Sequence, residues 1–187
     1  MANLPVRERI LVKAGEFFHV RGYGAVRLEE IIGATDVSKG AFYQDFSSKS
    51  ELGYAWLERL SKRMKIMHQN FLDNPADRDR RLRKYFYSMR GWMESNDFRG
   101  CQFANTAASV SHDDEDIIHL IDQYKRAQHK FFVELAASLV DQREAQRIGT
   151  AIFLLYSGAM AEAQNLKATW PLDDALVCAE ALCEIKR

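Results

Sequence analysis

The sequence predicts an all-α protein in which a small head of three helices is joined to a larger helical body. Apolar residues recur at steps of three and four, which is typical of helices, rather than in the alternation typical of strands. The 187 residues include only three prolines and ten glycines, so long uninterrupted helices are possible. This length suits one or two small domains and is enough to bury a sizeable core.

The head is predicted to begin with a helix over residues 6–20. Gly22 and Gly24 follow it, and glycine commonly ends a helix because it adopts the left-handed conformation easily. A second helix is predicted over residues 28–34, followed by a turn-sized break at Thr35-Asp36. The apolar face of the first helix contains Ile10, Val12, Ala14, Phe17 and Phe18.

The body is predicted to contain the remaining helices, and the first of them joins it to the head. They cover residues 50–71, 77–93, 102–110, a long segment from 113, then 143–166 and 172–186. Asn74-Pro75 and Trp170-Pro171 are predicted breaks, because the residue before a proline avoids the helical conformation.

The segment 37–49 is the most informative part of the chain. It predicts a short helix capped by Ser38, with a small residue at Ala41 and an aromatic pair at Phe42 and Phe46. It follows the apolar-periodic segment 28–34 after a tight turn. Two short helices in this arrangement, the second exposing small and polar groups, are typical of a helix-turn-helix that enters the major groove of DNA.

The residues around this motif extend the pattern from Arg7 to Leu52, and the first quarter of the chain resembles the N-terminal domain of TetR-family transcription regulators. The resemblance implies a helix-turn-helix DNA-binding domain at residues 1–48 and a ligand-binding and dimerisation domain at 49–187. The matching positions are Ile10, Ala14, Phe17-Phe18, Gly22-Tyr23, Glu30-Ile31, Val37-Ser38-Lys39-Gly40, Tyr43, Phe46, Lys49 and Leu52.

Five residues depart from the family pattern. Arg27 and Ala41 stand where the family usually has threonine or serine, Ile32 replaces alanine, and Asp36 replaces glycine. Asp45 occupies a position that often holds an aromatic residue or histidine. Asp36 can still adopt a left-handed turn. Ala41 and Asp45 therefore bear on base preference, and Arg27 is either a phosphate contact or a solvated arginine.

The resemblance implies a set of DNA contacts on and around the third helix: Arg27, Ser38, Lys39, Gly40, Ala41, Tyr43, Gln44 and Lys49. Gln44 is the candidate for base readout, since a carboxamide pairs with adenine through two hydrogen bonds. Tyr43 and Lys49 would bind phosphates. Phe42 belongs either to the core or to the DNA surface, and Asp45 either accepts from cytosine or pairs with Lys49.

The resemblance also implies a small-molecule effector held between the long helices of the body. The candidate ligand-binding residues are Met64, Met67, Trp92, Phe103, Asn105, Tyr124 and Tyr156. Trp92, Asn105, Tyr124 and Tyr156 would each bring a polar group into an apolar site. The alternative for every one of them is ordinary core packing.

Gly100-Cys101 is similar to a Gly-Cys motif in TetR-like repressors, some of which sense electrophiles or oxidants. A thiol at the start of a helix, next to Arg99, favours the reactive thiolate. The alternative is a small residue needed where helices pass closely. A helical enzyme using Cys101 is a further hypothesis, but no His or Asp partner lies at an informative spacing, so we predict no catalytic residue.

The resemblance implies a homodimer formed by the last two long helices, which would read a palindromic operator with two heads. The predicted interface residues are Ile152, Leu155, Ala159, Leu176, Ala179 and Leu182. The small residues of segment 158–163 would let another helix approach closely.

The charge of the chain is balanced, with 26 basic and 26 acidic residues. The first fifty residues contain seven Lys or Arg against six Asp or Glu, which is little positive charge for a DNA-binding domain. A helical interaction module that does not bind DNA is therefore the alternative from another functional class. The favoured hypothesis is a ligand-responsive, sequence-specific transcription regulator, more commonly a repressor than an activator.

Targeting and metal-binding signals are weak. Arg7, Glu8 and Arg9 interrupt any early apolar run, and the apolar segment 148–161 is too short to cross a bilayer. Cysteines at 101, 178 and 183 form no CxxC pair, so we expect a reducing cytoplasm and no membrane. His112 and His119 flank an acidic run that could imitate a metal site, but acids at a helix start commonly offset its dipole. We predict no metal and no cofactor.

Overall fold

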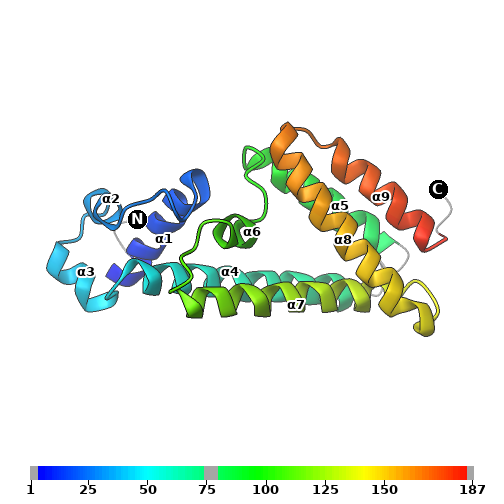
Figure 1. Ribbon diagram of the computed structural model, residues 1–187, viewed down its shortest axis with the longest axis horizontal. Coiled ribbons are helices and arrows are strands. Elements are labelled where there is room, and N and C mark those ends of the chain that lie inside the picture. Colours follow the sequence, from blue (N-terminus) through cyan, green and yellow to red (C-terminus); the bar gives the residue numbers. More distant parts are fainter. Residues whose placement is uncertain (1–3, 74–79, 185–187) are drawn as a thin grey trace. The chain divides into compact units, whose positions relative to one another are not determined.

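The computed structural model describes residues 4–73 and 80–184 and confirms the predicted all-α class. No strand occurs within these two ranges. The helices are α1 (Val6–Arg21), α2 (Leu28–Ala34), α3 (Lys39–Asp45), α4 (Lys49–Asp73), α5 (Arg81–Ser95), α6 (Gln102–Ala107), α7 (Glu115–Ala137), α8 (Gln142–Leu166) and α9 (Trp170–Leu182) (Figure 1).

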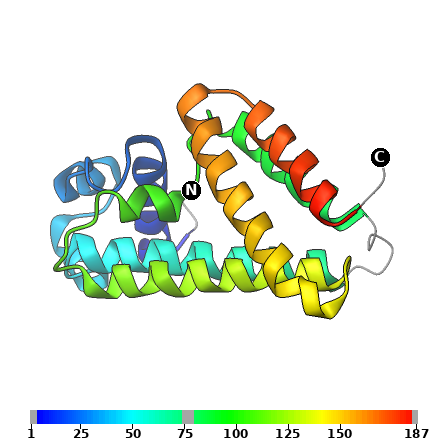
Figure 2. The ribbon, with the colours of Figure 1, turned by 45° about the vertical axis from the view of Figure 1, so that its right-hand side comes forward.

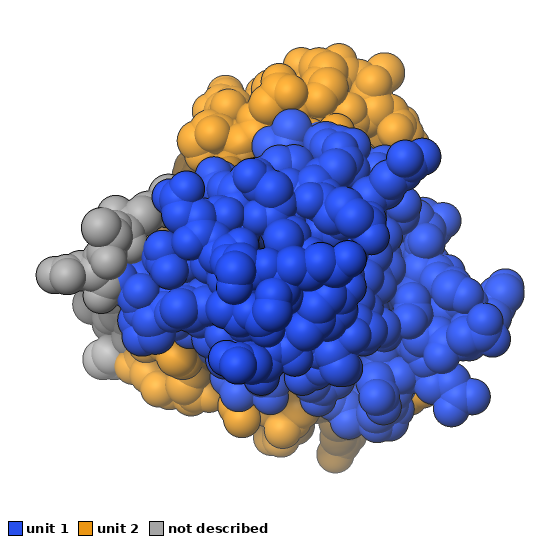
Figure 3. Space-filling model, turned by 90° about the vertical axis from the view of Figure 1, so that its left-hand side faces the viewer, with its two compact units in different colours: residues 1–63, 102–123 blue, residues 64–101, 124–187 orange. Residues whose placement is uncertain are grey.

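The chain divides into two compact units (Figure 3). Unit 1 contains residues 1–63 and 102–123, and unit 2 contains 64–101 and 124–187. Unit 1 thus combines the predicted head with the first part of α4, with α6 and with the start of α7. The boundary predicted between residues 48 and 49 follows the sequence motif, whereas the division into units follows packing.

Unit 1 is organised around a small apolar core. Ile10 and Phe18 of α1 and Ile31 of α2 are almost completely buried. Phe18 also contacts the rings of Tyr23 and Trp56, each at a centroid distance of 5.2 Å. These aromatic contacts connect α1 to the first half of α4.

Glycine ends α1 as predicted. Gly22 has a φ of 84°, and its N–H donates to the carbonyl oxygen of Phe18 at 3.0 Å. Gly24 has a different role, because a Cβ there would lie 2.9 Å from the Cβ of Ser109. The Gly24 N–H donates to the Ser109 hydroxyl at 3.3 Å. Because residue 24 has no side chain, the segment that follows α6 can lie close to the segment that follows α1.

The start of α4 is stabilised by a reciprocal cap. The Glu51 N–H donates to the Ser48 hydroxyl at 3.0 Å, while the Glu51 carboxylate accepts from the N–H and the hydroxyl of Ser47 at 2.8 and 2.7 Å. These bonds satisfy backbone groups that an uncapped helix would leave open. They also hold the pKa of Glu51 below its usual value.

Unit 2 packs α5, α8 and α9 together, and they lie side by side in both ribbon views (Figures 1 and 2). Its core includes Tyr85 and Phe86 of α5, Phe132 of α7 and Ile152 of α8. A Cβ at Gly149 would lie 2.5 Å from the Cα of Val133. The backbones of α7 and α8 therefore meet directly at this glycine.

Several predicted helix boundaries were wrong. Trp170-Pro171 does not precede the last helix but forms its first turn, where proline is favoured because its missing N–H needs no partner. The break comes earlier, at Lys167, whose φ of 52° ends α8 in the left-handed conformation. The short sixth helix stops at Ala107 instead of residue 110. The last helix ends at Leu182 instead of residue 186, because Cys183 caps it and Glu184 has a φ of 54°. The predicted break at Asn74-Pro75 and the predicted start at Asp77 lie outside the described residues.

Within the described ranges, none of these helices combines the length and the apolar character needed to cross a bilayer.

Candidate functional site

The third helix separates an apolar face from a polar one. Phe42 and Phe46 are 0% and 1% exposed, so they belong to the core of unit 1, and this resolves the alternative left open for Phe42. Lys39, Tyr43 and Gln44 are exposed on the same short helix. We call Lys39, Gly40, Tyr43 and Gln44 the α3 surface.

The N-terminus of α3 leaves its backbone accessible. The Ser38 hydroxyl accepts a hydrogen bond from the Ala41 N–H at 3.2 Å, which caps the helix as predicted. A Cβ placed on Gly40 would meet no atom within 4 Å, so the fold itself does not require glycine there. Ala41 is half-buried. The open space at Gly40 suits an external surface that comes close to the helix backbone.

Arg27 precedes α2 and is part of an exposed polar network. Its N–H donates to the Glu30 carboxylate at 2.8 Å, and the same carboxylate pairs with Arg21 at 2.6 Å. The hydrogen bond from Arg21, followed by that from the Arg27 backbone, lowers the pKa of Glu30. The Glu30 carboxylate thereby caps α2. The Arg27 side chain is exposed and makes no capping hydrogen bond.

Lys49 starts α4, and its half-buried side chain contacts an aromatic ring of unit 1. Its Nζ lies 4.4 Å from the centroid of the Tyr23 ring. Burial lowers the pKa of Lys49, and the Asp114 carboxylate opposes that shift. Of the two alternatives left open for Asp45, pairing with Lys49 is not found among the described residues, where the Lys49 ammonium contacts the Tyr23 ring instead.

Unit 2 contains a group of polar side chains inside its aromatic core, which we call the polar cluster: His68, Tyr85, Tyr124, Gln128 and Tyr156. The His68 ring stacks on Phe131 at a centroid distance of 4.1 Å and an interplanar angle of 9°. Its Nε2 lies 3.2 Å from the Tyr85 hydroxyl. Gln128, 2% exposed, donates to the Tyr124 hydroxyl at 3.3 Å.

The ionisation of the polar cluster follows from its burial. Burial lowers the pKa of His68 to about 4, so the ring is neutral at physiological pH. Burial also raises the pKa of Tyr85, Tyr124 and Tyr156 well above that of a free phenol. The cluster therefore offers neutral hydrogen-bonding groups in an apolar setting.

The Gly-Cys pair adjoins α8. Gly100 has a φ of 68°, and a Cβ there would fall 1.8 Å from Oε1 of Gln164. Both observations require glycine, because any side chain would strain the backbone and displace Gln164. Cys101 is half-buried directly after this turn and precedes α6. Its predicted role as a sensor is not decided by this geometry.

The predicted ligand-binding residues fall in both units. Met64, Met67, Trp92, Tyr124 and Tyr156 lie in unit 2, and Phe103 and Asn105 lie in unit 1. Met67 and Trp92 pack against the apolar core of unit 2, and Tyr156 is part of it. Their assignment to an effector site stays a prediction.

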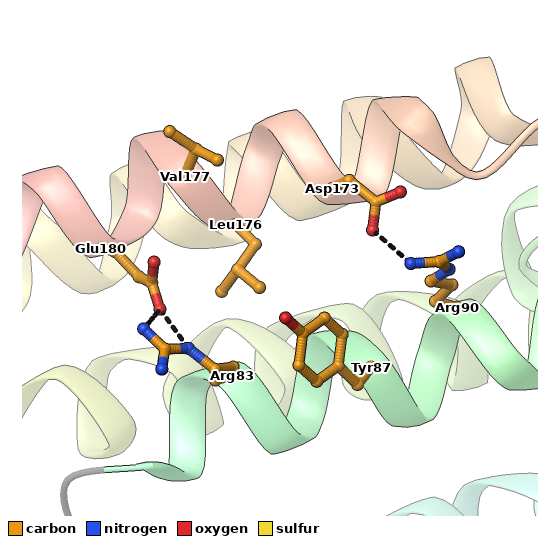
Figure 4. Close-up of a pocket in the computed structure, with 7 residues that line it drawn as sticks. All are labelled: Arg83, Tyr87, Arg90, Asp173, Leu176, Val177 and Glu180. Atoms are coloured by element: carbon orange, nitrogen blue, oxygen red, sulfur yellow. Dashed lines mark hydrogen bonds and ion pairs between the residues drawn. The ribbon is translucent and has the colours of Figure 1, made fainter. Parts of the chain in front are cut away.

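A cavity of about 450 Å³ lies on unit 2 between α5 and α9 (Figure 4). Arg83 pairs with Glu180 at 2.7 Å at one end, and Arg90 pairs with Asp173 at 3.1 Å at the other. Tyr87 stands between the two arginines, opposite Leu176 of α9. None of the predicted ligand-binding residues lines this cavity. Its lining residues are Arg83, Tyr87, Arg90, Asp173, Leu176, Val177 and Glu180.

The structure revises two of the predicted dimer-interface residues. Ile152 and Ala179 are 0% exposed and pack into the core of their own protomer, so they are not available to a partner. Ala159 and Leu176 are also buried, at 8% and 5% exposed, while Leu155 and Leu182 are partly buried and pack against the same core. These apolar side chains therefore pack against the body of their own protomer.

Two residues of the polar cluster have a signal in the sequence. His68 stands one turn after Met64 on α4, and Gln128 stands one turn after Tyr124 on α7. A polar residue in register with an apolar stripe indicates a buried polar group. Tyr23 contacts Asp114 and Lys49, which are far from it in the sequence. Local sequence patterns therefore could not predict these contacts.

Two family models match the chain. The model described as bacterial regulatory proteins, tetR family, matches residues 10–53. The model described as the C-terminal domain of LmrA/YxaF-like transcriptional regulators matches residues 80–177, more than half of the chain.

Similar proteins agree with these matches. The HTH-type transcriptional repressor DhaR of Mycobacterium sp. (strain GP1) is 28% identical over 190 residues, covering 97% of this chain and 94% of its own. The repressor NemR of Escherichia coli (strain K12) is 26% identical over 183 residues, covering 91% and 89%. The structure of SCO4454 from Streptomyces coelicolor superposes with a TM-score of 0.86 at 23% identity, covering 95% of this chain and 94% of that one. The chain belongs to the TetR family of DNA-binding transcription regulators.

Proposed function

We propose that this regulator is a ligand-responsive repressor that binds a palindromic operator as a homodimer and is released by a small molecule. The observation that carries the proposal is the division of α3, with Phe42 and Phe46 inside and the α3 surface outside. A recognition helix needs this arrangement, because its core side fixes the orientation in which the other side meets base edges. The repressors DhaR and NemR among its relatives support the direction of regulation.

Within the α3 surface, Gln44 is the proposed base-reading residue, and Lys39 and Tyr43 are proposed phosphate contacts. Lys39 lies 6.0 Å from the centroid of the Tyr43 ring, so the ammonium and the phenol occupy neighbouring positions. Both can donate to phosphate oxygens. Gln44 presents an amide that pairs with adenine.

The test is binding to duplex DNA from the region upstream of the regulator's own gene, measured by gel shift and then base by base. We expect Gln44→Ala to relax the preference at one base pair in each half-site by about 1–3 kcal/mol. Lys39→Ala is the matched control and should weaken all sequences alike. An unchanged base preference in Gln44→Ala would remove this residue from the readout role.

The proposed effector site is the polar cluster with the neighbouring Met67 and Trp92. Buried hydrogen-bonding groups within an aromatic core are typical of sites for small organic ligands. Since His68 and the three tyrosines are neutral, they suit an uncharged effector with hydrogen-bonding oxygen atoms. Such a ligand would favour dimers whose heads no longer match the operator spacing.

The proposed dimer uses the apolar side chains that α8 and α9 leave exposed. Leu154, Trp170 and Val177 are 62%, 55% and 41% exposed, although each is large and apolar. A second copy packed on these helices would remove this surface from water. They replace Ile152 and Ala179 in the predicted interface.

A second candidate mechanism is a thiol-based switch at Cys101. Its support is the position of Cys101, which is half-buried directly after the Gly100 turn and belongs to unit 2, as the polar cluster does. A solved structure of Escherichia coli NemR in its reduced form covers 94% of this chain with a TM-score of 0.80. An α,β-unsaturated carbonyl would form a bond between its β-carbon and the thiolate sulfur, and its α-carbon would take up a proton. The added group would then have to be accommodated beside the polar cluster.

Replacing the other thiols makes this mechanism testable. Cys178 is exposed and would react first, whereas burial and then Glu180 raise the pKa of Cys183 to about 11. In a Cys178→Ser/Cys183→Ser background, an unsaturated aldehyde should release DNA from the protein with Cys101 but not from Cys101→Ser. Equal release from both proteins excludes the thiol mechanism and leaves the non-covalent effector.

A further inference from the structure

The ammonium group of Lys49 is held by residues from two other parts of unit 1. Lys49 begins α4, and its Nζ lies 4.4 Å from the centroid of the Tyr23 ring, which follows α1. The Tyr23 hydroxyl lies 3.4 Å from Oδ2 of Asp114, which immediately precedes α7. Lys49, Tyr23 and Asp114 thus form one group, although they are far apart in the sequence.

The electrostatics of this group favour a positive charge at its centre. The face of a phenol ring attracts a cation, and a carboxylate attracts it more strongly. Burial, and then the charge of Asp114, raises the pKa of Tyr23, so its hydroxyl keeps the proton that it shares with the carboxylate. Asp114 also favours the charged form of Lys49 against the effect of burial.

The position of Tyr23 is fixed by close packing. Gly53 lies one turn after Lys49 on α4, and a Cβ there would come within 2.5 Å of Cε2 of Tyr23. The same Cβ would lie 3.2 Å from Cδ1 of Ile117, which is 0% exposed on the first turn of α7. The Tyr23 ring therefore occupies the space that a side chain at residue 53 would take, between α4 and α7.

This arrangement matters because Lys49 is a proposed phosphate contact. A lysine is a compact charge on a flexible stem, so its ammonium can be in one place or the other. A phosphate oxygen that draws the ammonium toward DNA would draw it away from the Tyr23 ring and from the charge of Asp114. The two sites therefore compete for one charge.

We propose that Tyr23 and Asp114 are positioning residues that hold the Lys49 ammonium in competition with DNA phosphate. The inference rests on the proposed DNA-binding function of this surface. Asp114 then weakens DNA binding in the resting protein, and any shift of the start of α7 away from Tyr23 changes how available Lys49 is. The later turns of the same helix carry Tyr124 and Gln128 of the polar cluster.

The experiment measures affinity and its salt dependence by fluorescence anisotropy with a labelled duplex from the protein's own upstream region. Phosphate contacts are independent of sequence, so even non-specific binding reports on Lys49. The variants are Asp114→Asn and, as a matched control for loss of one negative charge, Asp116→Asn, which changes an exposed residue of the same turn.

We expect Asp114→Asn to bind about threefold more tightly than Asp116→Asn, as the loss of one partly screened charge–charge attraction would give. Its plot of log affinity against log salt should be steeper by up to about one phosphate contact, roughly 0.9 in slope. In a Lys49→Ala background the two variants should bind equally. Tyr23→Phe keeps the ring but removes the hydroxyl that contacts Asp114, and it should tighten binding to a smaller extent.

Equal affinities of Asp114→Asn and Asp116→Asn, or a difference that persists without Lys49, would overturn the proposal. Weaker binding by Asp114→Asn with an intact thermal transition would overturn it as well. A wild-type protein that binds no duplex at any salt concentration would instead refute the proposed function, so the two failures are distinguishable.

Discussion

The two candidate sites differ in where their polar side chains lie. On α3 these side chains are exposed to solvent, whereas in unit 2 they are buried in an aromatic core. In α3 the aromatic residues Phe42 and Phe46 are buried, and Lys39, Tyr43 and Gln44 face solvent. In unit 2 the aromatic core encloses His68 and Gln128, which are 7% and 2% exposed. The α3 surface is built to meet a large charged partner without reorganising. The polar cluster can meet a partner only if the partner is small and replaces neighbouring side chains.

The contrast is most sharply tested by removing an inner residue of α3. Phe42→Ala should lower the free energy of unfolding by about 3–5 kcal/mol, because it deletes a fully buried aromatic ring. Tyr43→Ala, next to it and 44% exposed, should cost far less. Chemical denaturation followed by circular dichroism measures both. Similar losses for the two variants would mean that α3 has no distinct inner face.

The buried histidine gives unit 2 a dependence on pH that α3 lacks. The folded-state pKa of His68 is about 4, below the unfolded value of about 6.5, so the unfolded chain binds the extra proton. The stability associated with neutral His68 is complete above pH 6.5 and is lost as the pH falls, amounting to about 3 kcal/mol by pH 4.

Denaturant titrations from pH 7 to pH 4 measure this loss. His68→Gln should be less stable at pH 7 but should show a flatter pH dependence. His119→Gln, an exposed histidine that bonds Gln123 at 2.8 Å, is the control and should follow the wild type. A pH dependence that is unchanged in His68→Gln assigns the effect to other groups.

A third kind of surface, apolar and exposed, distinguishes α8 from both regions. Leu154→Glu should weaken self-association by about 2 kcal/mol or more, as expected for an apolar anchor at the centre of an interface. Ile66→Glu is matched in chemistry, since Ile66 is 64% exposed on α4. Sedimentation equilibrium should show a change only for Leu154. Equal dissociation, or none, would place the interface elsewhere.

The smallest expected effect comes from a substitution on the α3 surface that changes DNA binding without changing stability. Tyr43→Phe should keep the stability of the wild type, because the ring and its edge contact with Phe42 remain. Loss of the hydroxyl should weaken binding to all duplexes alike by about 1 kcal/mol, the usual contribution of one hydrogen bond. Titrations against several sequences measure it. A loss confined to one sequence would make Tyr43 a base-reading residue.

The residue types next to each helix were enough to predict the C-terminus of α1 and the N-terminus of α3. Gly22 has the positive φ that a helix-ending glycine favours, and Ser38 caps the next backbone turn, so neighbouring residues alone determine both features. Trp170-Pro171 misled because proline both breaks a helix and suits its first turn. Only the left-handed Lys167 decides between these roles, and its conformation is not apparent from its residue type.

The parts of the sites that depend on remote neighbours were beyond the sequence. Gly53 is required by Tyr23 and Ile117, and Gly100 by Gln164, but none of these partners is adjacent in the chain. The burial of a residue also depends on neighbours that are remote in the sequence. Ile152 and Leu154 are similar residues of one helix, yet one is 0% and the other 62% exposed, because the helix packs on one side only. An apolar stripe in the sequence predicts that one face of a helix is buried. It does not predict which element packs on that face.

The contact at Gly149 has a mechanical consequence for unit 2. Where α8 meets α7, the Cα of Val133 and the carbonyl oxygen of Phe132 would lie 2.5 and 2.8 Å from a Cβ at residue 149. Helices that slide past one another do so on layers of side chains that can change rotamer, and here that layer is missing. The direct backbone contact at this point therefore opposes sliding of α7 along α8 more than a layer of side chains would.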